Sequence, residues 1–346
     1  MKNWLIKKIL DFTGSQKFLS MQLDITNTCN LKCVHCYQPD HRGGELPFSS
    51  WQNILGQYSN LAEKLALKPC FSLSGGEPTI SPLFEPMLKE IHNRWPAAVI
   101  TIITNGTALS EKIISEIKSH GADVQLSLDG PDAERHDIIR GKGSFDKMMA
   151  GCSALQKAGI NPTFQAVLSR RTAPWIGDFF EAAEKLEISS MNFTRFVPQG
   201  RGKILAENQE DRPLVGLDLK NAYARILESS RKTGIETGTN SPLFVLLAPE
   251  LGAHGKAGFQ GVVVDYRGNL KLTSRADFKL GNILEEGLEN LFLNHPIMKD
   301  LRARRIEVCG VCEYYDRCGG DRNASFVEYG SFLKKDPGCW LQPDTH

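Results

Sequence analysis

The chain has 346 residues, and its 41 Lys and Arg against 40 Asp and Glu leave a formal net charge of +1. This length is enough for one large domain with a smaller one, and the near-zero charge gives no reason to expect nucleic-acid partners. Because no apolar run approaches about 18 residues, we expect no membrane-spanning helix.

The first residues mix lysines with apolar side chains, as in Trp4-Leu5-Ile6-Lys7-Lys8-Ile9-Leu10. This pattern predicts a short amphipathic helix within an N-terminal segment of residues 1–19. It does not resemble a signal peptide, so we expect a cytoplasmic protein.

Between residues 20 and 232, short runs of apolar and β-branched residues alternate with helical patterns about six times. The expected strands are 20–25, 70–73, 98–104, 123–129, 162–168 and 189–197. The expected helices are 50–66, 81–94, 109–119, 144–158, 173–186 and 216–233. Such alternation predicts an α/β fold with a parallel sheet covered by helices. Six repeats favour a partial (β/α)6 barrel of the TIM type over residues 20–233.

After residue 234 the rhythm changes, because Gly and Pro become frequent and the helical patterns shorten. Residues 261–265 and 270–272 predict two strands around a turn at Gly268-Asn269. Further on, the basic run of Arg302, Arg304 and Arg305 predicts a solvated helix face. We therefore expect a second, small domain over residues 234–346.

The nine cysteines do not suggest disulfides, since their number is odd, the chain is large and a secretion signal is not visible. Seven of them fall into two groups, which is typical of metal ligands in a cytosolic chain. The other two, Cys70 and Cys152, are expected to be small core residues. The two groups are Cys29, Cys33 and Cys36 near the N-terminus, and Cys309, Cys312, Cys318 and Cys339 near the C-terminus.

The first group has the spacing C-x3-C-x2-C and directly follows the strand expected at 20–25. Three thiolates on one loop can hold three corners of a cubane iron–sulfur cluster and leave the fourth iron without a protein ligand. An open iron can bind a substrate or cofactor. We expect His35, inside this loop, to pack or hydrogen-bond near the cluster without ligating it.

Further motifs stand where later strands end, which is where functional groups lie in barrels of this kind. Two glycines in the first motif permit close approach of main chain to a ligand, and Glu77 or nearby carbonyls could hold an ammonium group. Asn105 could meet a ribose or a carboxylate, and Arg140 is suited to a carboxylate. The motifs are Ser74-Gly75-Gly76-Glu77-Pro78, Thr104-Asn105-Gly106, Ser127-Leu128-Asp129-Gly130 and Arg195-Phe196-Val197-Pro198.

Together with the cysteine loop, the runs Ser74–Pro78, Ser127–Pro131 and Arg140–Phe145 resemble the radical S-adenosylmethionine (SAM) superfamily. The run Arg195–Arg201 and the C-terminal cysteines are similar to its SPASM-domain subgroup, which includes many maturases of peptides and proteins. The resemblance covers roughly residues 20–340.

This resemblance implies a [4Fe-4S] cluster on Cys29, Cys33 and Cys36, with SAM bound to the open iron. One electron, from a flavodoxin or ferredoxin, would cleave SAM to a 5′-deoxyadenosyl radical that abstracts a substrate hydrogen atom. The residues expected to contact SAM are Ser74, Gly75, Gly76, Glu77, Asn105, Ser127 and Arg140.

The SPASM pattern implies seven cysteines for two auxiliary clusters, and this chain supplies four. Gly255, Thr273 and Arg322 stand where cysteines of the inner cluster are expected. The remaining set, Cys309, Cys312, Cys318 and Cys339, matches the outer cluster. We therefore expect one fully ligated auxiliary [4Fe-4S] cluster, with a zinc site as the alternative.

For the substrate, the subgroup favours a peptide or protein that undergoes post-translational modification. Because about 20 residues precede the first strand, a peptide is expected to need a separate recognition protein or to dock directly in the barrel. The alternative is a dehydrogenase or epimerase acting on a small molecule, such as a sugar or a cofactor precursor. A non-catalytic scaffold is the remote alternative. Ser274 stands where some related enzymes carry an acidic general base, and neither Asp265 nor Asp277 is assigned a role.

Overall fold

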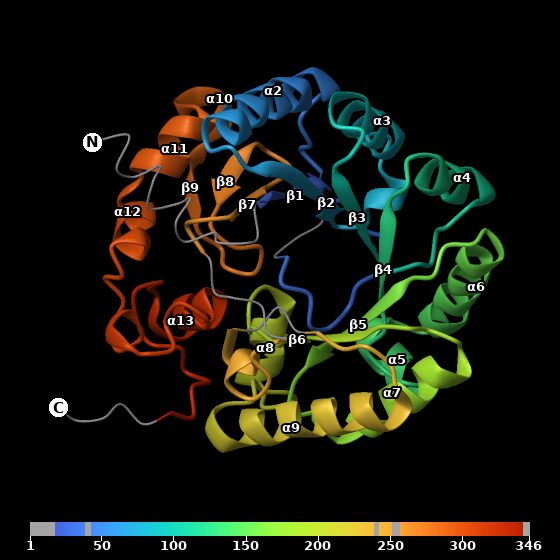
Figure 1. Cartoon of the computed structure of the whole chain (residues 1–346). Coiled ribbons are helices and arrows are strands. Elements are labelled where there is room, and N and C mark those ends of the chain that lie inside the picture. The colour runs from blue at the N-terminus through green and yellow to red at the C-terminus, as the bar shows by residue number, and fades with distance from the viewer. Residues whose placement is uncertain (1–17, 39–42, 239–241, 251–256, 342–346) are drawn as a thin grey trace.

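The computed structural model describes residues 18–38, 43–238, 242–250 and 257–341. Its centre is a nine-stranded sheet in the order β6-β5-β4-β3-β2-β1-β7-β8-β9. The sheet curves around a central space with helices on its outer side (Figure 1). This is the partial barrel with outer helices that the alternation of strands and helices predicts, so the expected fold class is confirmed.

The first six strands run parallel to one another, in chain order across the sheet. All six lie where the sequence predicts strands, with boundaries that differ by a few residues. Because their carboxyl ends meet at one edge, the loops that follow them converge there. The strands are β1 (Phe18–Thr26), β2 (Lys68–Gly75), β3 (Val99–Thr104), β4 (Asp123–Ser127), β5 (Thr163–Leu168) and β6 (Met191–Arg195).

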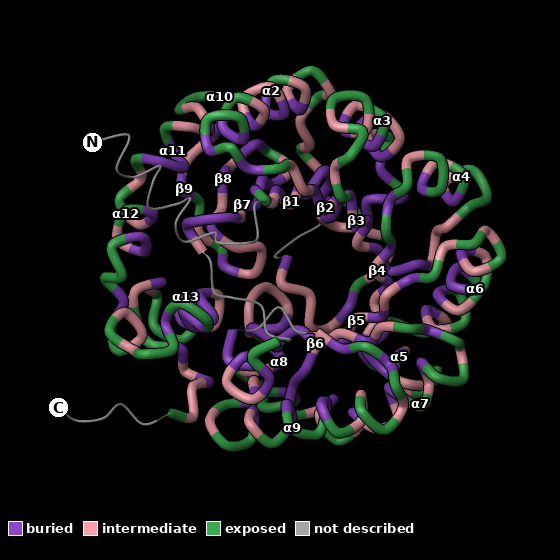
Figure 2. The backbone as a smooth tube through the Cα atoms, in the orientation of Figure 1, coloured by how far each residue is buried: buried purple, intermediate pink, exposed green. Residues whose placement is uncertain are grey.

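In β1 the side chains alternate, as its period of two requires. Leu19, Met21 and Leu23 are fully buried, whereas Ser20 and Gln22 line the central cavity. Burial is concentrated in the strands and on the inward faces of the helices, and the exposed residues lie on the rim (Figure 2). The barrel therefore has an apolar outer core and a polar interior.

The six expected helices are present, and the sequence did not predict several short ones. The expected helices are α2 (Phe48–Lys64), α3 (Phe84–Arg94), α4 (Glu111–Ser119), α6 (Ser144–Lys157), α7 (Ile176–Lys185) and α9 (Gly216–Thr233). The additional ones are α5 (Ala133–Arg140), α8 (Arg201–Glu207), α10 (Ile283–Glu286), α11 (Leu288–Asn294), α12 (Pro296–Arg302) and α13 (Arg322–Tyr329). None of the described helices is long and apolar enough to cross a membrane.

The C-terminal part of the chain extends the same sheet. β7 (Gly261–Val264) pairs in parallel with β1, and Met21 lies opposite Val262. β8 (Asn269–Lys271) and β9 (Lys279–Asn282) follow as antiparallel neighbours, so the expected hairpin is present with one more strand. The domain boundary expected near residue 234 stays a prediction. The sheet itself contains strands from both sides of this residue.

The N-terminal helix expected within residues 1–19 lies outside the described residues, except that Phe18 and Leu19 begin β1. The prediction that Arg302, Arg304 and Arg305 form a solvated helix face is partly wrong. Arg302, the last residue of α12, is only 1% exposed. Its Nε donates to the carbonyl of Gly258 at 2.6 Å, and its guanidinium lies 4.6 Å from the ring centroid of Phe292. Arg304 and Arg305 are exposed as expected, but both lie beyond the end of α12 and form no helix face.

Candidate functional site

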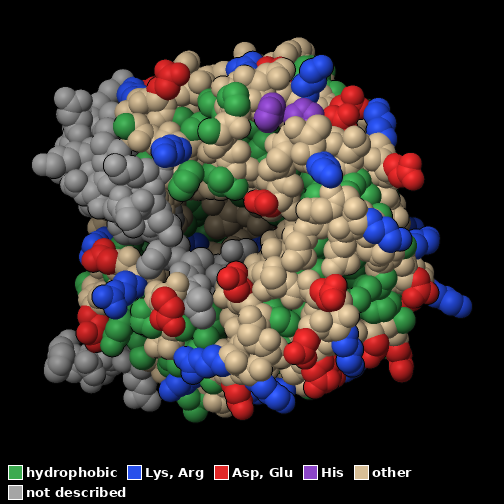
Figure 3. Space-filling model, turned by 45° about the vertical axis from the view of Figure 1, so that its right-hand side comes forward, with side chains coloured by type: hydrophobic (Ala, Val, Ile, Leu, Met, Phe, Trp, Pro, Cys, Tyr) green, Lys and Arg blue, Asp and Glu red, His purple; other side chains and the backbone are tan. Residues whose placement is uncertain are grey.

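A cavity of about 730 Å³ opens at the carboxyl ends of the strands. In the space-filling view it appears as a deep hollow in one face of the molecule (Figure 3). Its walls come from the barrel strands, from the loop that carries Cys29, Cys33 and Cys36, and from the segments 272–275 and 320–323. The predicted cysteine loop, most of the predicted cofactor contacts and part of the C-terminal region therefore share one cavity.

The three cysteines of the first group all line this cavity. The main-chain N–H of Leu31 points to the Sγ of Cys29 at 3.4 Å, and Arg140 Nη1 lies 3.9 Å from the Sγ of Cys33. Burial raises the pKa of Cys29 to about 11 and also raises that of Cys33, a shift that the charge of Arg140 opposes. Binding to a metal would remove these protons, since the thiolate is the ligand.

The loop after β6 packs against the main chain of the cysteine loop. The main-chain N–H of Arg201 donates to the carbonyl of Cys36 at 2.9 Å. Gly200 adopts φ +56°, and a Cβ there would lie 2.6 Å from the carbonyl oxygen of Tyr37 and 2.7 Å from that of Cys36. Only glycine allows both this backbone conformation and this approach. The Arg195–Arg201 motif therefore fixes the position of Cys36.

The two glycines after β2 pack against the chain that leads into the cysteine loop. A Cβ on Gly75 would lie 2.2 Å from the carbonyl oxygen of Thr26, and one on Gly76 would lie 2.2 Å from that of Thr28. The N–H of Gly76 donates to Thr26 at 2.8 Å. Ser74, Gly75 and Gly76 all line the cavity, as predicted for cofactor contacts.

Glu77 differs from its neighbours, because it is absent from the residues that line the cavity. Its buried carboxylate accepts hydrogen bonds from the hydroxyls of Thr79 and Thr104, both at 2.6 Å, and from the N–H of Asn105 at 2.8 Å. Burial raises its pKa, and these donors oppose the shift. In this structure Glu77 holds the loop after β3, and its role as a cofactor contact stays a prediction.

Asn105 and Ser127 line the cavity next to this loop. The Asn105 side chain accepts from the hydroxyl of Thr107 at 2.6 Å and donates to Asn30 at 2.9 Å. Ser127 Oγ donates to the carbonyl of Thr104 at 3.3 Å. Asn105 therefore ties the loop after β3 to the cysteine loop.

Arg140 already has a carboxylate partner within the protein. Its Nε donates to Oδ2 of the fully buried Asp129 at 2.5 Å, and His35 Nε2 lies 2.7 Å from the same oxygen. Burial acts to raise the pKa of Asp129, but the charge of Arg140 and the contact with His35 hold it far below its ordinary value. His35 thus hydrogen-bonds beside the cysteine loop as expected, and Asp129 is a site residue whose role sequence reasoning missed.

The C-terminal cysteines lie near enough to one another to affect each other's pKa. Burial raises the pKa of Cys318 to about 12, with contributions from Cys309 and Cys339. The pKa of Cys339 is also raised by burial, with Cys309 and Cys312 contributing. The thiols therefore influence one another, and their role as one shared ligand set stays a prediction.

The residues that replace the inner-cluster cysteines have distinct environments. Arg322 is buried, donates to the carbonyls of Phe332 and Lys334 at 2.8 and 2.7 Å, and has Nη2 3.7 Å from the Sγ of Cys309. Thr273 Oγ1 is buried without a hydrogen-bond partner. Gly255 lies outside the described residues.

Arg322 and Thr273 both line the cavity, and so do Ser274, Arg275 and Asn323.

The chemistry of the first donor set fits an iron–sulfur cluster, since Cys29, Cys33 and Cys36 are thiols on one short loop, and the second group likewise consists of cysteine thiols, with Cys339 separated from the others by α13. Within the described residues, no set of three or more His, Cys, Asp and Glu side chains is arranged so that it could hold a metal ion. Sequence reasoning also missed the buried carboxylates Asp321 and Asp336, which contact Arg195.

Comparison with known proteins identifies the barrel. Residues 23–171 match the model of the radical SAM superfamily. The AdoMet-dependent heme synthase of Methanosarcina barkeri is 28% identical over 97% of this chain and 99% of its own length. The mycofactocin maturase MftC of Mycobacterium ulcerans is also 28% identical, over 91% of this chain and 86% of its own.

Solved structures show the same fold. SuiB of Streptococcus suis bound to the precursor peptide SuiA aligns with a TM-score of 0.76 at 16% identity, covering 98% of this chain and 80% of that one. AnSMEcpe with bound AdoMet aligns with a TM-score of 0.70 at 21% identity, covering 93% and 94%. These structures agree with the expected fold, and the family match shows that residues 23–171 form a radical SAM domain, as the sequence motifs predict.

Proposed function

We propose that this chain is a radical SAM enzyme that modifies a peptide or protein. The observation that carries the proposal is that Cys29, Cys33 and Cys36 line the same cavity as Ser74, Gly75 and Gly76. A [4Fe-4S] cluster with bound SAM supplies a 5′-deoxyadenosyl radical, which removes one hydrogen atom from the substrate. The protein's own part is to hold these groups, exclude water and direct one C–H bond toward them.

We assign these tasks to different residues of the cavity. Ser74, Gly75 and Gly76 offer main-chain and hydroxyl groups to the polar atoms of SAM. The guanidinium of Arg140 faces Cys33 and offsets the negative charge of a thiolate-ligated cluster. Asp129 fixes both Arg140 and His35, so it positions these two side chains beside the cluster without contacting SAM itself.

A peptide substrate is supported by the maturase relatives, which match more than nine-tenths of this chain. Recognition would use a separate protein or direct docking at the cavity mouth, and a flavodoxin or ferredoxin would supply the electron. We infer that Cys309, Cys312, Cys318 and Cys339 hold one auxiliary [4Fe-4S] cluster. Because all four irons would carry a protein ligand, this cluster would transfer electrons or stabilise the fold and would not bind substrate.

The second candidate is a small-molecule substrate of the cofactor-precursor kind. A specific observation favours it, because the heme synthase of Methanosarcina barkeri matches this chain over nearly the whole of both lengths. A carboxylated tetrapyrrole would be the first compound to test in this class.

Anaerobic reconstitution followed by reduction in the presence of SAM tests the proposal. The expected result is 5′-deoxyadenosine together with about eight irons per chain. Cys29→Ala should abolish 5′-deoxyadenosine, and Cys318→Ala should leave about four irons per chain. A reconstituted protein with full iron that forms no 5′-deoxyadenosine would overturn the enzyme proposal, and about four irons with one zinc would overturn the auxiliary cluster.

A further inference from the structure

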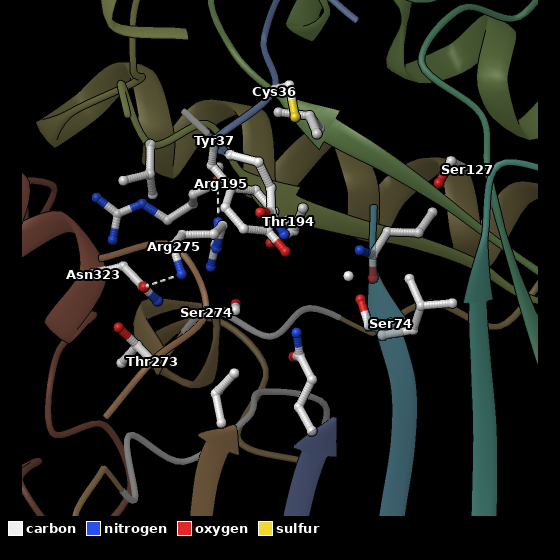
Figure 4. Close-up of a pocket in the computed structure, with 18 of the residues that line it drawn as sticks. Cys36, Tyr37, Ser74, Ser127, Thr194, Arg195, Thr273, Ser274, Arg275 and Asn323 are labelled. Atoms are coloured by element: carbon white, nitrogen blue, oxygen red, sulfur yellow. Dashed lines mark hydrogen bonds between the residues drawn. The ribbon is translucent and has the colours of Figure 1, made fainter. Parts of the chain in front are cut away.

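One wall of the cavity carries Thr273, Arg275 and Asn323. Binding of the cluster and of SAM does not account for these three residues. Figure 4 shows these residues on one side of the cavity and Ser74 and Ser127 on the other. We name this group the carboxylate wall and propose that it binds a carboxylate group of the substrate. The proposal rests on the proposed function, because it assigns the substrate side of the same cavity.

Arg275 carries the charge of this wall. Three arginines line this part of the cavity, namely Arg195, Arg275 and Arg322. Arg195 pairs with Asp336 at 2.8 Å, and Arg322 is held by main-chain carbonyls and the thiol of Cys309.

Arg275, in contrast, makes no ion pair within the described part of the chain, and its guanidinium donates only through Nη1, to the carbonyl of Arg195. A cation facing a cavity with donors to spare is suited to a carboxylate, which it can bind with two parallel hydrogen bonds. The nearby carboxylate of Asp321 caps α13 through Oδ1, and its Oδ2 lies 3.6 Å from Arg195 Nη1 without a hydrogen bond to the described residues.

Thr273 supplies an independent observation. Its hydroxyl oxygen is buried and makes no hydrogen bond with the described residues. Leaving a buried hydroxyl unpaired costs about 1–3 kcal/mol, and such groups are rare unless a ligand satisfies them. A substrate carboxylate between Thr273 and Arg275 would accept a hydrogen bond from both.

Asn323 completes the wall and fixes its shape. Its Oδ1 accepts the main-chain N–H of Arg275 at 3.1 Å, which connects α13 to the segment that carries Thr273. The amide group of the same side chain is a further donor at the cavity. The absence of the inner-cluster cysteines at positions 273 and 322 therefore leaves a wall whose side chains donate hydrogen bonds, where the SPASM pattern would bind iron.

Binding of acids and their neutral counterparts to the reconstituted, SAM-bound protein tests this assignment. One pair is an alanine pentapeptide and its C-terminal amide, and the other is coproporphyrin III and its tetramethyl ester. The wild type should bind at least one acid at least tenfold more tightly than its neutral counterpart. The acid that is preferred shows whether the carboxylate belongs to a peptide or to a tetrapyrrole.

The variants separate binding from a structural role. Arg275→Gln should remove the preference for the acid, whereas Arg275→Lys should retain part of it. Arg170→Gln is the matched control, because Arg170 is 65% exposed and outside the cavity, and it should bind like the wild type.

Thr273→Val should act in opposite directions on two measurements. Replacing the unpaired hydroxyl with a methyl group should stabilise the ligand-free protein against denaturant, and the same change should weaken acid binding severalfold. Thr273→Ser should leave both properties close to wild type. A structural role for Thr273 would instead lower stability in the valine variant.

Two results would overturn the assignment. One is a wild type that binds neither acid better than its neutral counterpart, and the other is an Arg275→Gln variant that keeps the preference. Both are distinguishable from failure of the proposed function, because the wild type would still form 5′-deoxyadenosine from SAM.

Discussion

Arg195 Nη1 lies 2.8 Å from Oδ2 of Asp336, and both side chains are buried although 141 residues separate them in the chain. Arg195 ends β6, and Asp336 accepts the N–H of Asp321 at 2.7 Å, three residues after Cys318. The main-chain carbonyl of Asp336 also accepts the N–H of Cys339. This one ion pair therefore links the barrel to the loops of two predicted auxiliary ligands.

Asp336→Asn should destabilise the protein, because it leaves the buried charge of Arg195 without its main partner. Breaking a buried pair from one side typically costs about 3–5 kcal/mol. Denaturant unfolding should show this loss, and the irons assigned to the auxiliary site should be released first. Asp218→Asn is the matched control, since its pair with Arg170 is exposed, and it should change stability by less than about 1 kcal/mol. Equal effects of the two variants would contradict the prediction.

Gly200→Ala should impair the N-terminal cluster site. The new Cβ would overlap the carbonyl oxygens of Tyr37 and Cys36, and the backbone would be strained at φ +56°. We expect reduced iron at this site and slower formation of 5′-deoxyadenosine. Gly234→Ala is the control, because Gly234 has φ +73° with no atom within 4 Å of the new Cβ. It should cost stability by about 1 kcal/mol and leave iron binding intact.

His136 should make the stability of the protein fall as the pH is lowered below about 6.5. Burial, assisted by the charge of Arg140, lowers its pKa to about 4. Between these two values the unfolded chain binds the proton and the folded chain does not, so acid favours unfolding. The expected loss between pH 7.5 and pH 5 is about 2 kcal/mol.

The measurement is denaturant unfolding of the cluster-free protein at several pH values, compared with His136→Gln. The difference in stability between the two proteins should change with pH, because the contributions of other titrating groups cancel. A difference in stability that stays constant between pH 7.5 and pH 5 would contradict this prediction, because it would mean that His136 has the same pKa in the folded and unfolded states.

Arg322→Gln should make the proposed auxiliary cluster harder to reduce. The variant removes a positive charge and the N–H that lies 3.7 Å from the Sγ of Cys309. Both changes favour the oxidised, less negative cluster, so the reduction potential should move to a more negative value. Spectroscopic redox titration measures the shift, and the iron content shows whether the cluster is retained.

The exposed Arg304 provides the comparison for this variant. It pairs with Asp316 at the surface, and Arg304→Gln should leave the potential close to that of the wild type, because water screens its charge. A potential that is unchanged in Arg322→Gln, with full iron, would contradict the role of Arg322.

The sequence predicts the barrel well because its signals are local. Alternating burial in β1 follows from the alternating side chains of Leu19 to Ile25, and the glycines at 75 and 76 indicate close backbone approach before any contact is known. The spacing of Cys29, Cys33 and Cys36 likewise predicts that they share one loop.

Long-range charge partners could not be predicted in this way. His35 and Asp129 are 94 residues apart in the chain. That His35 pairs with Asp129 and not with a neighbouring acid depends on how the end of β4 packs against the cysteine loop. Arg302 was misassigned for a related reason, since periodicity cannot show that the carbonyl of Gly258 and the ring of Phe292 cover it. α5 was missed because it is short, at eight residues, and has few apolar positions.

The pairing of β7 with β1 also affects how the chain folds during synthesis. Until residues 261–264 have left the ribosome, β1 is an edge strand with unpaired main-chain groups. The loop with Cys29, Cys33 and Cys36 directly follows that strand, so its cavity lacks one wall for the first three-quarters of translation. We therefore expect the cavity to be completed only after the C-terminal part of the chain has been made, and a protein truncated before β7 would expose β1 as an aggregation-prone edge next to its first three predicted ligands.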